Sequence, residues 1–443
     1  MSVKTRIAPS PTGLMHIGTV RTALFNYLYA KQNDGTFVVR VEDTDKERGK
    51  PEWTEAIWQG LDWLGLTPDE KYIQSDHVER HSELLADLIS KDIAYVSKEL
   101  AKDGSGRSVE VVRLRNAGKS ITFSDVVHGD ITFDTTELGD FVIARTPVDP
   151  LYHFAVVVDD MDENITHVIR GEDHISNTPR QILIQEAIGA EKPTYIHLPL
   201  ILAPDRSKLS KRKHGASVEA YREAGFLPEA MLNYLALLGW NPGTDQEIFS
   251  MENLLQEFTL EKIQKSPAIF DEEKLRWVNR EHLLQLSEDV FEESALEHLK
   301  KALSERITFN ESVARKLIPI LRERIDTWGD IDKAVGEGEY DYFFVAPNID
   351  EDDLVWKEST IDDAKQHLVN ARQLLESAPE SAWESTETIQ SILWEYAEEA
   401  GKGSVLWPLR YALSGRKKSP DPFSLAYVLG KEEVLIRLNS ILS

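Results

Sequence analysis

The chain begins with a strand, a loop and a helix in close succession, and this order restricts the possible fold more than any other stretch. Residues 3–8 suit a buried strand, and residues 9–13 then enforce a loop, because proline fixes φ and lacks an N–H group. From Gly18 onward, apolar residues recur at the spacing of a helix, at Val20, Leu24, Tyr27 and Leu28. The start of a helix presents free backbone N–H groups, so this junction is expected to bind an anion.

Two residues at this junction suit contact with a nucleotide. Gly18 has no side chain, so a ring or a phosphate can approach the backbone closely there. His16 can donate a hydrogen bond to a phosphate oxygen. Because short motifs recur by chance, the alternative is an ordinary βα unit with an incidental histidine.

A second stretch, residues 204–214, concentrates positive charge in a chain whose net charge is −26. Its basic residues are Arg206, Lys208, Lys211, Arg212 and Lys213. Such a cluster repels itself and needs an anion to hold it compact. Lysine is a point charge on a flexible stem, which suits phosphate groups that move during a reaction.

These two stretches together resemble the two signature motifs of class I aminoacyl-tRNA synthetases. The matching residues are Pro-Ser-Pro-Thr-Gly-Leu-Met-His-Ile-Gly (9–18) and Lys-Leu-Ser-Lys-Arg (208–212). The flanking segments 21–28, 41–45, 168–174 and 177–181 are similar to bacterial glutamyl-tRNA synthetases. The resemblance covers most of the chain and is therefore specific.

The resemblance implies ATP-dependent attachment of L-glutamate to the 3′ end of tRNA(Glu) through a glutamyl adenylate, with Mg²⁺ accompanying ATP. One alternative is a form that also charges tRNA(Gln). Another is an enzyme like the glutamyl-queuosine tRNA synthetases, whose family lacks the C-terminal helical part that this chain has. A catalytically silent tRNA-binding paralogue should have lost His16 or the lysine loop, and both are present.

Amino-acid activation joins a carboxylate, already ionised at pH 7, to the α-phosphorus of ATP. The enzyme must therefore align the reactants and neutralise phosphate charge, and it needs no general base. The resemblance assigns His16 to the phosphates or ribose, and Lys208 and Lys211 to the departing pyrophosphate. ATP would also contact Gly18, Asp173 and Ile201.

Recognition of glutamate requires groups for two carboxylates and one ammonium. Arg6 and Arg170, at strand ends, are candidates for bidentate pairing with the side-chain carboxylate. Glu42 is the candidate for the ammonium. The other expected contacts are Ala8, Ser10 at the α-carboxylate, and the Tyr152 hydroxyl. The alternative for each charged residue is a structural salt bridge.

Strands alternate with helices in the first half of the chain, which predicts a doubly wound parallel sheet of the Rossmann type. Strands are expected at 36–42, 154–160, 167–170 and 195–202, with a short β-rich insertion and all-α C-terminal domains. The expected parts are a catalytic domain over 1–95 and 146–215, an acceptor-binding insertion over 96–145, a helical stem-contact domain over 216–309, and a helical anticodon-binding domain over 310–443.

Net charge and composition restrict the partners and metals. The net charge of −26 disfavours RNA, but exposed charges are screened beyond about 8 Å, so a local basic face can still bind it. The resemblance places Arg410, Arg416, Lys417 and Lys418 there, the alternative being a solvated helix end. The chain has no cysteine, so we expect no zinc and no protein-held metal. We also expect a cytoplasmic monomer without signal peptide or membrane span.

Overall fold

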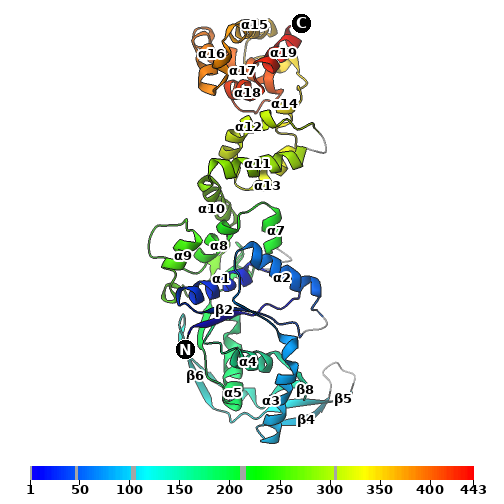
Figure 1. Ribbon diagram of the computed structural model, residues 1–443, viewed down its shortest axis with the longest axis vertical. Coiled ribbons are helices and arrows are strands. Elements are labelled where there is room, and N and C mark those ends of the chain that lie inside the picture. Colours follow the sequence, from blue (N-terminus) through cyan, green and yellow to red (C-terminus); the bar gives the residue numbers. More distant parts are fainter. Residues whose placement is uncertain (1, 45–47, 101–105, 210–215, 304–306) are drawn as a thin grey trace. The chain divides into compact units, whose positions relative to one another are not determined.

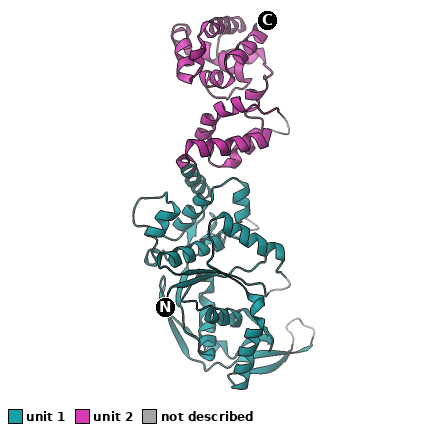
Figure 2. Cartoon of the chain, viewed as in Figure 1, with its two compact units in different colours: residues 1–282 teal, residues 283–443 magenta. Residues whose placement is uncertain are grey.

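The computed structural model describes residues 2–44, 48–100, 106–209, 216–303 and 307–443 (Figure 1). The chain divides into two compact units, Met1–His282 and Leu283–Ser443 (Figure 2). Unit 1 contains all of the described strands, and unit 2 is helical. This finding confirms the predicted fold class, an α/β sheet followed by helices.

A seven-stranded sheet forms the centre of unit 1, in the order β3-β2-β1-β10-β11-β6-β7. Neighbouring strands from β3 to β6 pair in parallel, and only β7 runs antiparallel to its neighbour. The strands are β1 (Lys4–Ile7), β2 (Thr36–Val41), β3 (Glu70–Ile73), β10 (His167–Gly171), β11 (Thr194–Leu198), β6 (Ser120–Asp125) and β7 (Gly129–Asp134). The chain order reverses between β1 and β10, and ligands bind at such a switch point, beyond the carboxyl ends of the strands.

Helices cover both faces of this sheet (Figure 1). The helices α1 (Ile17–Gln32) and α2 (Pro51–Trp63) share one core with Ile169 and Ile196. On the other face, α3 (Val78–Ser90), α4 (Tyr152–Asp162) and α5 (Thr178–Ile188) share a second core with Val168 and Tyr195. Alternate residues of one strand therefore enter different cores, as the pleat of a strand requires.

The expected strand at 154–160 is wrong, because these residues belong to helix α4. Residues 154–159 are all buried in the helix. A short, wholly apolar run gives no period that separates a buried strand from a buried helix, and here the helical form places Asp159 and Asp160 over the sheet.

The strands of the β-rich segment after α3 divide between two sheets. Four of its strands make an antiparallel sheet, β4-β5-β8-β9. These strands are β4 (Ala94–Leu100), β5 (Ser108–Leu114), β8 (Phe141–Thr146) and β9 (Asp149–Pro150). The hairpin of β6 and β7 instead joins the central sheet, where Asp125 of β6 pairs in register with Tyr195 of β11. The hairpin therefore contributes two strands directly to the central sheet.

The rest of unit 1 is mostly helical. Two short parallel strands, β12 (Ile201–Leu202) and β13 (Ala268–Ile269), pair with each other. The helices are α7 (Val218–Glu223), α8 (Pro228–Leu237), α9 (Met251–Glu257) and α10 (Glu272–Gln285), whose last residues belong to unit 2. Single 3₁₀ turns lie at Gln74–His77, Thr136–Leu138, Glu172–Asn177 and Leu260–Lys262.

Unit 2 consists of helices joined by short loops. They are α11 (Glu288–Leu303), α12 (Glu311–Arg324), α13 (Trp328–Gly336), α14 (Asp341–Phe344), α15 (Ile361–Ser377), α16 (Thr386–Ala400), α17 (Lys402–Ser414), α18 (Pro422–Leu429) and α19 (Lys431–Leu442), with 3₁₀ turns at Glu351–Leu354 and Glu380–Trp383. Through the described ranges of both units, none of the helices has the length and apolar character needed to cross a membrane.

One glycine is required by the close approach of β1 and β2. A Cβ on Gly35 would collide with the carbonyl oxygen of Val3, which accepts the first hydrogen bond of β2 from the Thr36 N–H group (2.9 Å). We predict that Gly35→Ala lowers the free energy of unfolding by about 1–3 kcal/mol, measured by urea unfolding. As a control, Gly336→Ala should be nearly neutral, because a Cβ there meets no atom within 4 Å.

Candidate active site

A cavity of about 440 Å³ lies at the switch point of the sheet. Its walls come from the end of β1 and the following loop, the start of α1, the ends of β2 and β10, and the segment around β12. Eleven of the residues proposed from the sequence line it: Arg6, Ala8, Ser10, His16, Gly18, Glu42, Tyr152, Arg170, Asp173, Ile201 and Lys208. The structure therefore brings together the two distant sequence motifs, up to Lys208. Lys211 lies outside the described residues.

The start of helix α1 differs from the expectation of free N–H groups. The Nδ1 atom of His16 accepts a hydrogen bond from the N–H group of Gly18 (2.9 Å). The N–H group of Ile17 donates to the Ala216 carbonyl (3.2 Å), and those of Thr19 and Val20 donate to the His16 carbonyl. The chain thus caps its own helix, so anion binding there must rely on side chains unless these bonds exchange.

This cap also explains why residue 18 is a glycine, and it determines which tautomer the neutral ring of His16 adopts. A Cβ on Gly18 would lie 3.0 Å from Nδ1 of His16, so the absent side chain makes room for the imidazole ring before it makes room for any ligand. Because Nδ1 accepts a hydrogen bond, the neutral ring carries its proton on Nε2. That tautomer can donate to an oxygen, as the sequence analysis required of His16.

The described part of the lysine loop is engaged with the opposite wall of the cavity. The Nζ atom of Lys208 lies 2.9 Å from Oδ2 of Asp173, and both side chains are largely exposed. An exposed pair of this kind contributes little to stability, so it can exchange for another partner at small cost. Ile201 of β12 also lines the cavity.

Two charged residues of the cavity wall, Arg6 and Arg170, come from strand positions whose side chains point toward α4. Alternation along β1, β2, β10 and β11 places Ile7, Val39, Ile169 and Leu198 in the core on the α1 face. The residues one position away therefore point toward α4, and these are Arg6, Arg40, Arg170 and His197. Their burial next to a ligand cavity requires each one to have a polar partner.

Arg6 is paired with a carboxylate of the chain itself. Its Nε and Nη2 atoms donate to the two oxygens of Asp160 on α4, at 3.0 and 3.3 Å. Arg6 thus forms a structural salt bridge, which was the alternative to its expected role in glutamate binding. Its Nε–Nη2 edge is occupied, and Nη1 has no partner among the described residues.

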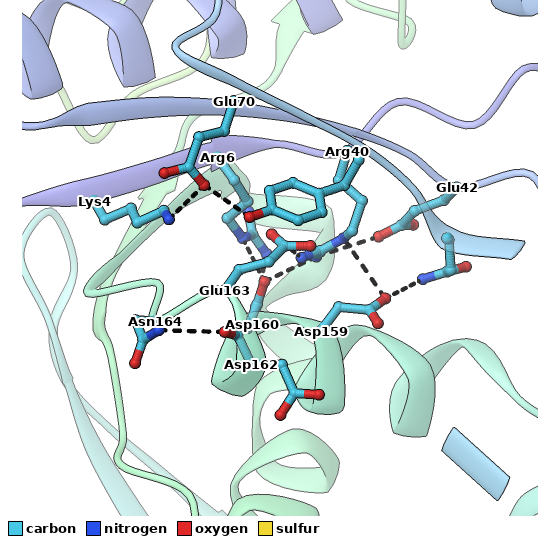
Figure 3. A network of polar contacts seen from close by, with 12 residues as sticks. Lys4, Arg6, Arg40, Glu42, Glu70, Asp159, Asp160, Asp162, Glu163 and Asn164 are labelled. Carbon is cyan, nitrogen blue, oxygen red and sulfur yellow. Dashed lines mark hydrogen bonds and ion pairs between the residues drawn. The ribbon is translucent and has the colours of Figure 1, made fainter. Parts of the chain in front are cut away.

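Arg40 is fully buried in β2 and holds the acids of α4 against the sheet (Figure 3). Its Nη1 donates to Glu163 and its Nη2 to Asp160, each at 2.8 Å. Nη2 also lies 3.6 Å from Glu42, and Nε lies 3.8 Å from Asp159. The network therefore joins two guanidinium groups, those of Arg6 and Arg40, to four carboxyl groups.

Burial and neighbouring charges shift the pKa of three of these carboxyl groups. Burial opposes ionisation of Asp160, but Arg6 and Arg40 outweigh it and lower its pKa. Burial raises the pKa of Glu42 to about 7 against the opposing effect of Arg40, and it raises the pKa of Glu163 to about 7 in the same way. Glu42 and Glu163 are therefore only partly ionised near pH 7, and the network reaches the cavity through Glu42 and Arg6.

Arg170 has the opposite environment. Its Nε donates to Nε2 of His197 (3.1 Å) and its Nη2 donates to the Thr178 hydroxyl (2.8 Å). Among the described residues no carboxylate forms an ion pair with it, although only 6% of its surface is exposed. Burial lowers the pKa of Arg170. This side of the cavity therefore carries a positive charge that only a ligand can neutralise.

The four basic residues proposed to contact RNA lie in unit 2, and three of them are tied to nearby groups. Arg410 donates to the Lys417 carbonyl (2.8 Å), and Arg416 donates to the Gly338 carbonyl (3.0 Å). Lys417 pairs with Asp353 at 2.8 Å. Lys418 is exposed; Arg410 lies within α17, and the other three follow the end of this helix.

Sequence reasoning missed the residues that hold the arginines. Arg40 and His197 each interrupt a buried strand, and a charged or polar residue in such a run signals a buried partner. Asp160 was misplaced because its helix was interpreted as a strand. Asp125 gave no signal of its own. In the described ranges, no cluster of three or more His, Asp or Glu side chains is placed to hold a metal ion.

Two family models match this chain. The model described as tRNA synthetases class I (E and Q), catalytic domain, matches residues 2–105 and 98–277. The model described as anticodon binding domain matches residues 282–442. The chain therefore belongs to the class I tRNA synthetases.

Full-length relatives specify the branch of this family. A glutamate–tRNA ligase of Acidithiobacillus ferrooxidans is 39% identical, with 99% of this chain and 98% of the relative covered. One from Francisella tularensis subsp. novicida is 38% identical, with 99% of each covered. The crystal structure of a glutamate tRNA ligase from Elizabethkingia meningosepticum, in complex with its amino acid, has a TM-score of 0.86 at 30% identity, with 100% of this chain and 99% of the other covered. Within the family, the chain thus groups with the glutamate–tRNA ligases.

The raised pKa of Glu163 gives a prediction about stability. Its ordinary value is 4.5 and its folded value is about 7, so folding takes up a proton between these values, and the free energy of unfolding falls as pH rises through that window. A neutral amide avoids this loss. We predict that the free energy of unfolding of Glu163→Gln, relative to that of the wild type, is roughly 1–2 kcal/mol higher at about pH 8 than at about pH 5. Urea unfolding at both pH values measures this; an unchanged difference contradicts it.

Proposed function

We propose that this chain attaches L-glutamate to the 3′ end of tRNA(Glu), forming a glutamyl adenylate from ATP on the way. The names of its full-length relatives support this activity. The structural observation that carries the proposal is the charge arrangement of the cavity. One wall has an excess of carboxyl groups that ends at Glu42, and the other has Arg170 without an acid partner.

In this proposal the two walls orient glutamate by charge. Glu42 receives the ammonium group, which supplies the positive charge that the network of Arg40 lacks. The side-chain carboxylate lies at Arg170 and Arg6, each offering its Nη1 atom because its other edge is occupied. Tyr152, Ser10 and Ala8 complete the contacts, the Tyr152 hydroxyl lying 3.3 Å from Nδ1 of His174.

The same cavity has room for ATP along the start of α1. His16, Gly18, Asp173, Ile201 and Lys208 are the proposed contacts, together with Lys211. Lys208 must leave Asp173 to reach a phosphate. Mg²⁺ belongs to the proposal as a companion of the ATP phosphates, where it would offset their charge. The chain's own residues align the carboxylate with the α-phosphorus and stabilise the departing pyrophosphate.

The helical part of the chain is proposed to bind the anticodon arm. The match of residues 282–442 to the anticodon-binding model supports this role. We assign Arg410, Arg416, Lys417 and Lys418 to RNA contact, which requires Lys417 to leave Asp353. The finer division proposed from the sequence, with a stem-contact part over 216–309 and an acceptor-binding part over 96–145, belongs to the same proposal.

The comparisons do not favour a tRNA-modifying enzyme. That family lacks a C-terminal helical part, whereas the glutamate–tRNA ligases above match along 99% of this chain. Charging of tRNA(Gln) depends on the anticodon-facing side chains and is decided by experiment.

The direct test is charging of purified tRNA(Glu) and tRNA(Gln), side by side, with labelled glutamate and labelled glutamine. We predict charging with glutamate and at least about a hundredfold lower kcat/KM with glutamine, because glutamine leaves the buried Arg170 charge unpaired. Transfer of glutamine by active protein, without transfer of glutamate, would refute the proposal.

The role given to Glu42 predicts a pH dependence. Glu42 must be ionised to hold the ammonium, and its pKa is raised by burial to about 7, so it gains a proton as pH falls below this value. The KM for glutamate in aminoacylation should therefore rise toward about tenfold per pH unit below pH 7. In Glu42→Gln the KM should be high and nearly independent of pH. The KM for ATP, measured in parallel, serves as the control.

A further inference from the structure

Arg170 is held by two neutral groups in neighbouring parts of the fold. Its partner His197 stands directly opposite it in the register of β10 and β11. His197 is fully buried, and its Nε2 atom accepts the hydrogen bond from Nε of Arg170. Thr178, the first residue of α5, receives Nη2. This arrangement fixes the guanidinium plane without cancelling its charge.

The accepting role of His197 depends on which ring nitrogen carries the proton. Oδ2 of Asp125 lies 2.7 Å from Nδ1 of His197 and also accepts the backbone N–H group of the same residue (3.1 Å). A carboxylate in that position requires an N–H group on Nδ1, so the neutral ring has its lone pair on Nε2. The hydrogen bond from Arg170 needs that lone pair.

Asp125 is itself held in place. Its Oδ1 atom accepts the backbone N–H groups of Val127 (3.0 Å) and His128 (2.9 Å) at the turn of the β6–β7 hairpin. Asp125 is 2% exposed and pairs in register with Tyr195, two residues before His197 on β11. The other charged or titratable groups near the ring are Arg170, His174, Tyr195, whose ring stacks on it with centroids 6.1 Å apart, and His128, whose Nε2 lies 3.1 Å from the His197 carbonyl oxygen.

We propose that Asp125 and His197 are positioning residues that aim Arg170 at the side-chain carboxylate of the substrate. Asp125 sets the tautomer of His197, and His197 holds Arg170 through Nε2. The inference rests on the proposed function, because it assigns the substrate carboxylate to Arg170. It explains why the acid lies one ring away from the arginine. A carboxylate in direct contact would neutralise Arg170, as Asp160 does for Arg6, and would weaken its pairing with an anionic substrate.

Two substitutions of His197 separate the two ends of its ring. His197→Gln keeps an oxygen near the position of Nε2, so Arg170 retains its acceptor. His197→Asn keeps a donor near Nδ1 and loses the acceptor. We expect His197→Asn to raise the KM for glutamate about tenfold or more, and His197→Gln to stay within about threefold of wild type. The KM for ATP should change by less than about twofold in both.

Asp125→Asn tests whether the acid acts through the tautomer. The amide can donate to Nδ1, which moves the ring proton to Nε2, where it opposes the N–H group of Arg170. We expect the KM for glutamate to rise about tenfold with histidine at position 197 and to change by less than about threefold in the His197→Gln background. A purely structural effect of Asp125 would appear in both backgrounds.

Three outcomes would overturn the inference. One is an equal rise of the KM for glutamate in His197→Asn and His197→Gln. Failure of both variants to fold would also overturn the inference. The second is an equal effect of Asp125→Asn in the two backgrounds. The third is a parallel rise in the KM for ATP. Failure of the wild-type protein to charge tRNA with glutamate would instead refute the proposed function, so the two failures are distinguishable.

Discussion

Arg40 has a fully buried guanidinium group, and the structure of the active-site side of the sheet depends on it. A charge in that position is tolerated only with several hydrogen-bonded acids around it. Asp160 of α4 and Glu163, the residue directly after this helix, supply them, which ties the helix to the end of β2. Because Asp160 also holds Arg6, the same contact that satisfies Arg40 sets the position of a cavity residue on the neighbouring strand.

In the cavity, the neighbours of each charged residue decide whether its charge is neutralised, and the residue type alone does not. Arg6 and Arg170 lie on adjacent strands and point the same way, yet Arg6 is neutralised by Asp160 and Arg170 is held by a neutral ring. Glu42 stands at the acidic end, where burial raises its pKa to about 7 and leaves its carboxyl group only partly ionised near neutral pH. A ligand with an ammonium at one end and a carboxylate at the other fits this gradient in one direction only.

The sequence was sufficient for the parallel character of the sheet and for eleven of the residues that line the cavity, because parallel strand ends converge and the motifs lie at those ends. It was not sufficient for their partners. Arg6 and Asp160 are 154 residues apart, and periodicity carries no information about such a pair. Helix α4 was misassigned because an apolar run of that length suits either structure. The cap formed by His16 was missed because its side chain was considered only as a ligand contact, and not as an acceptor for the N–H group of Gly18.

The β6–β7 hairpin belongs to the sheet although it is encoded within the antiparallel segment. Between β5 and β8 the chain leaves one sheet, adds two strands to the other and returns. That stretch is therefore not a structurally independent module, because removing it would also remove two edge strands from the central sheet. Insertions and deletions in this lineage should accordingly collect in the β4–β5 connection and spare the passage that carries Asp125.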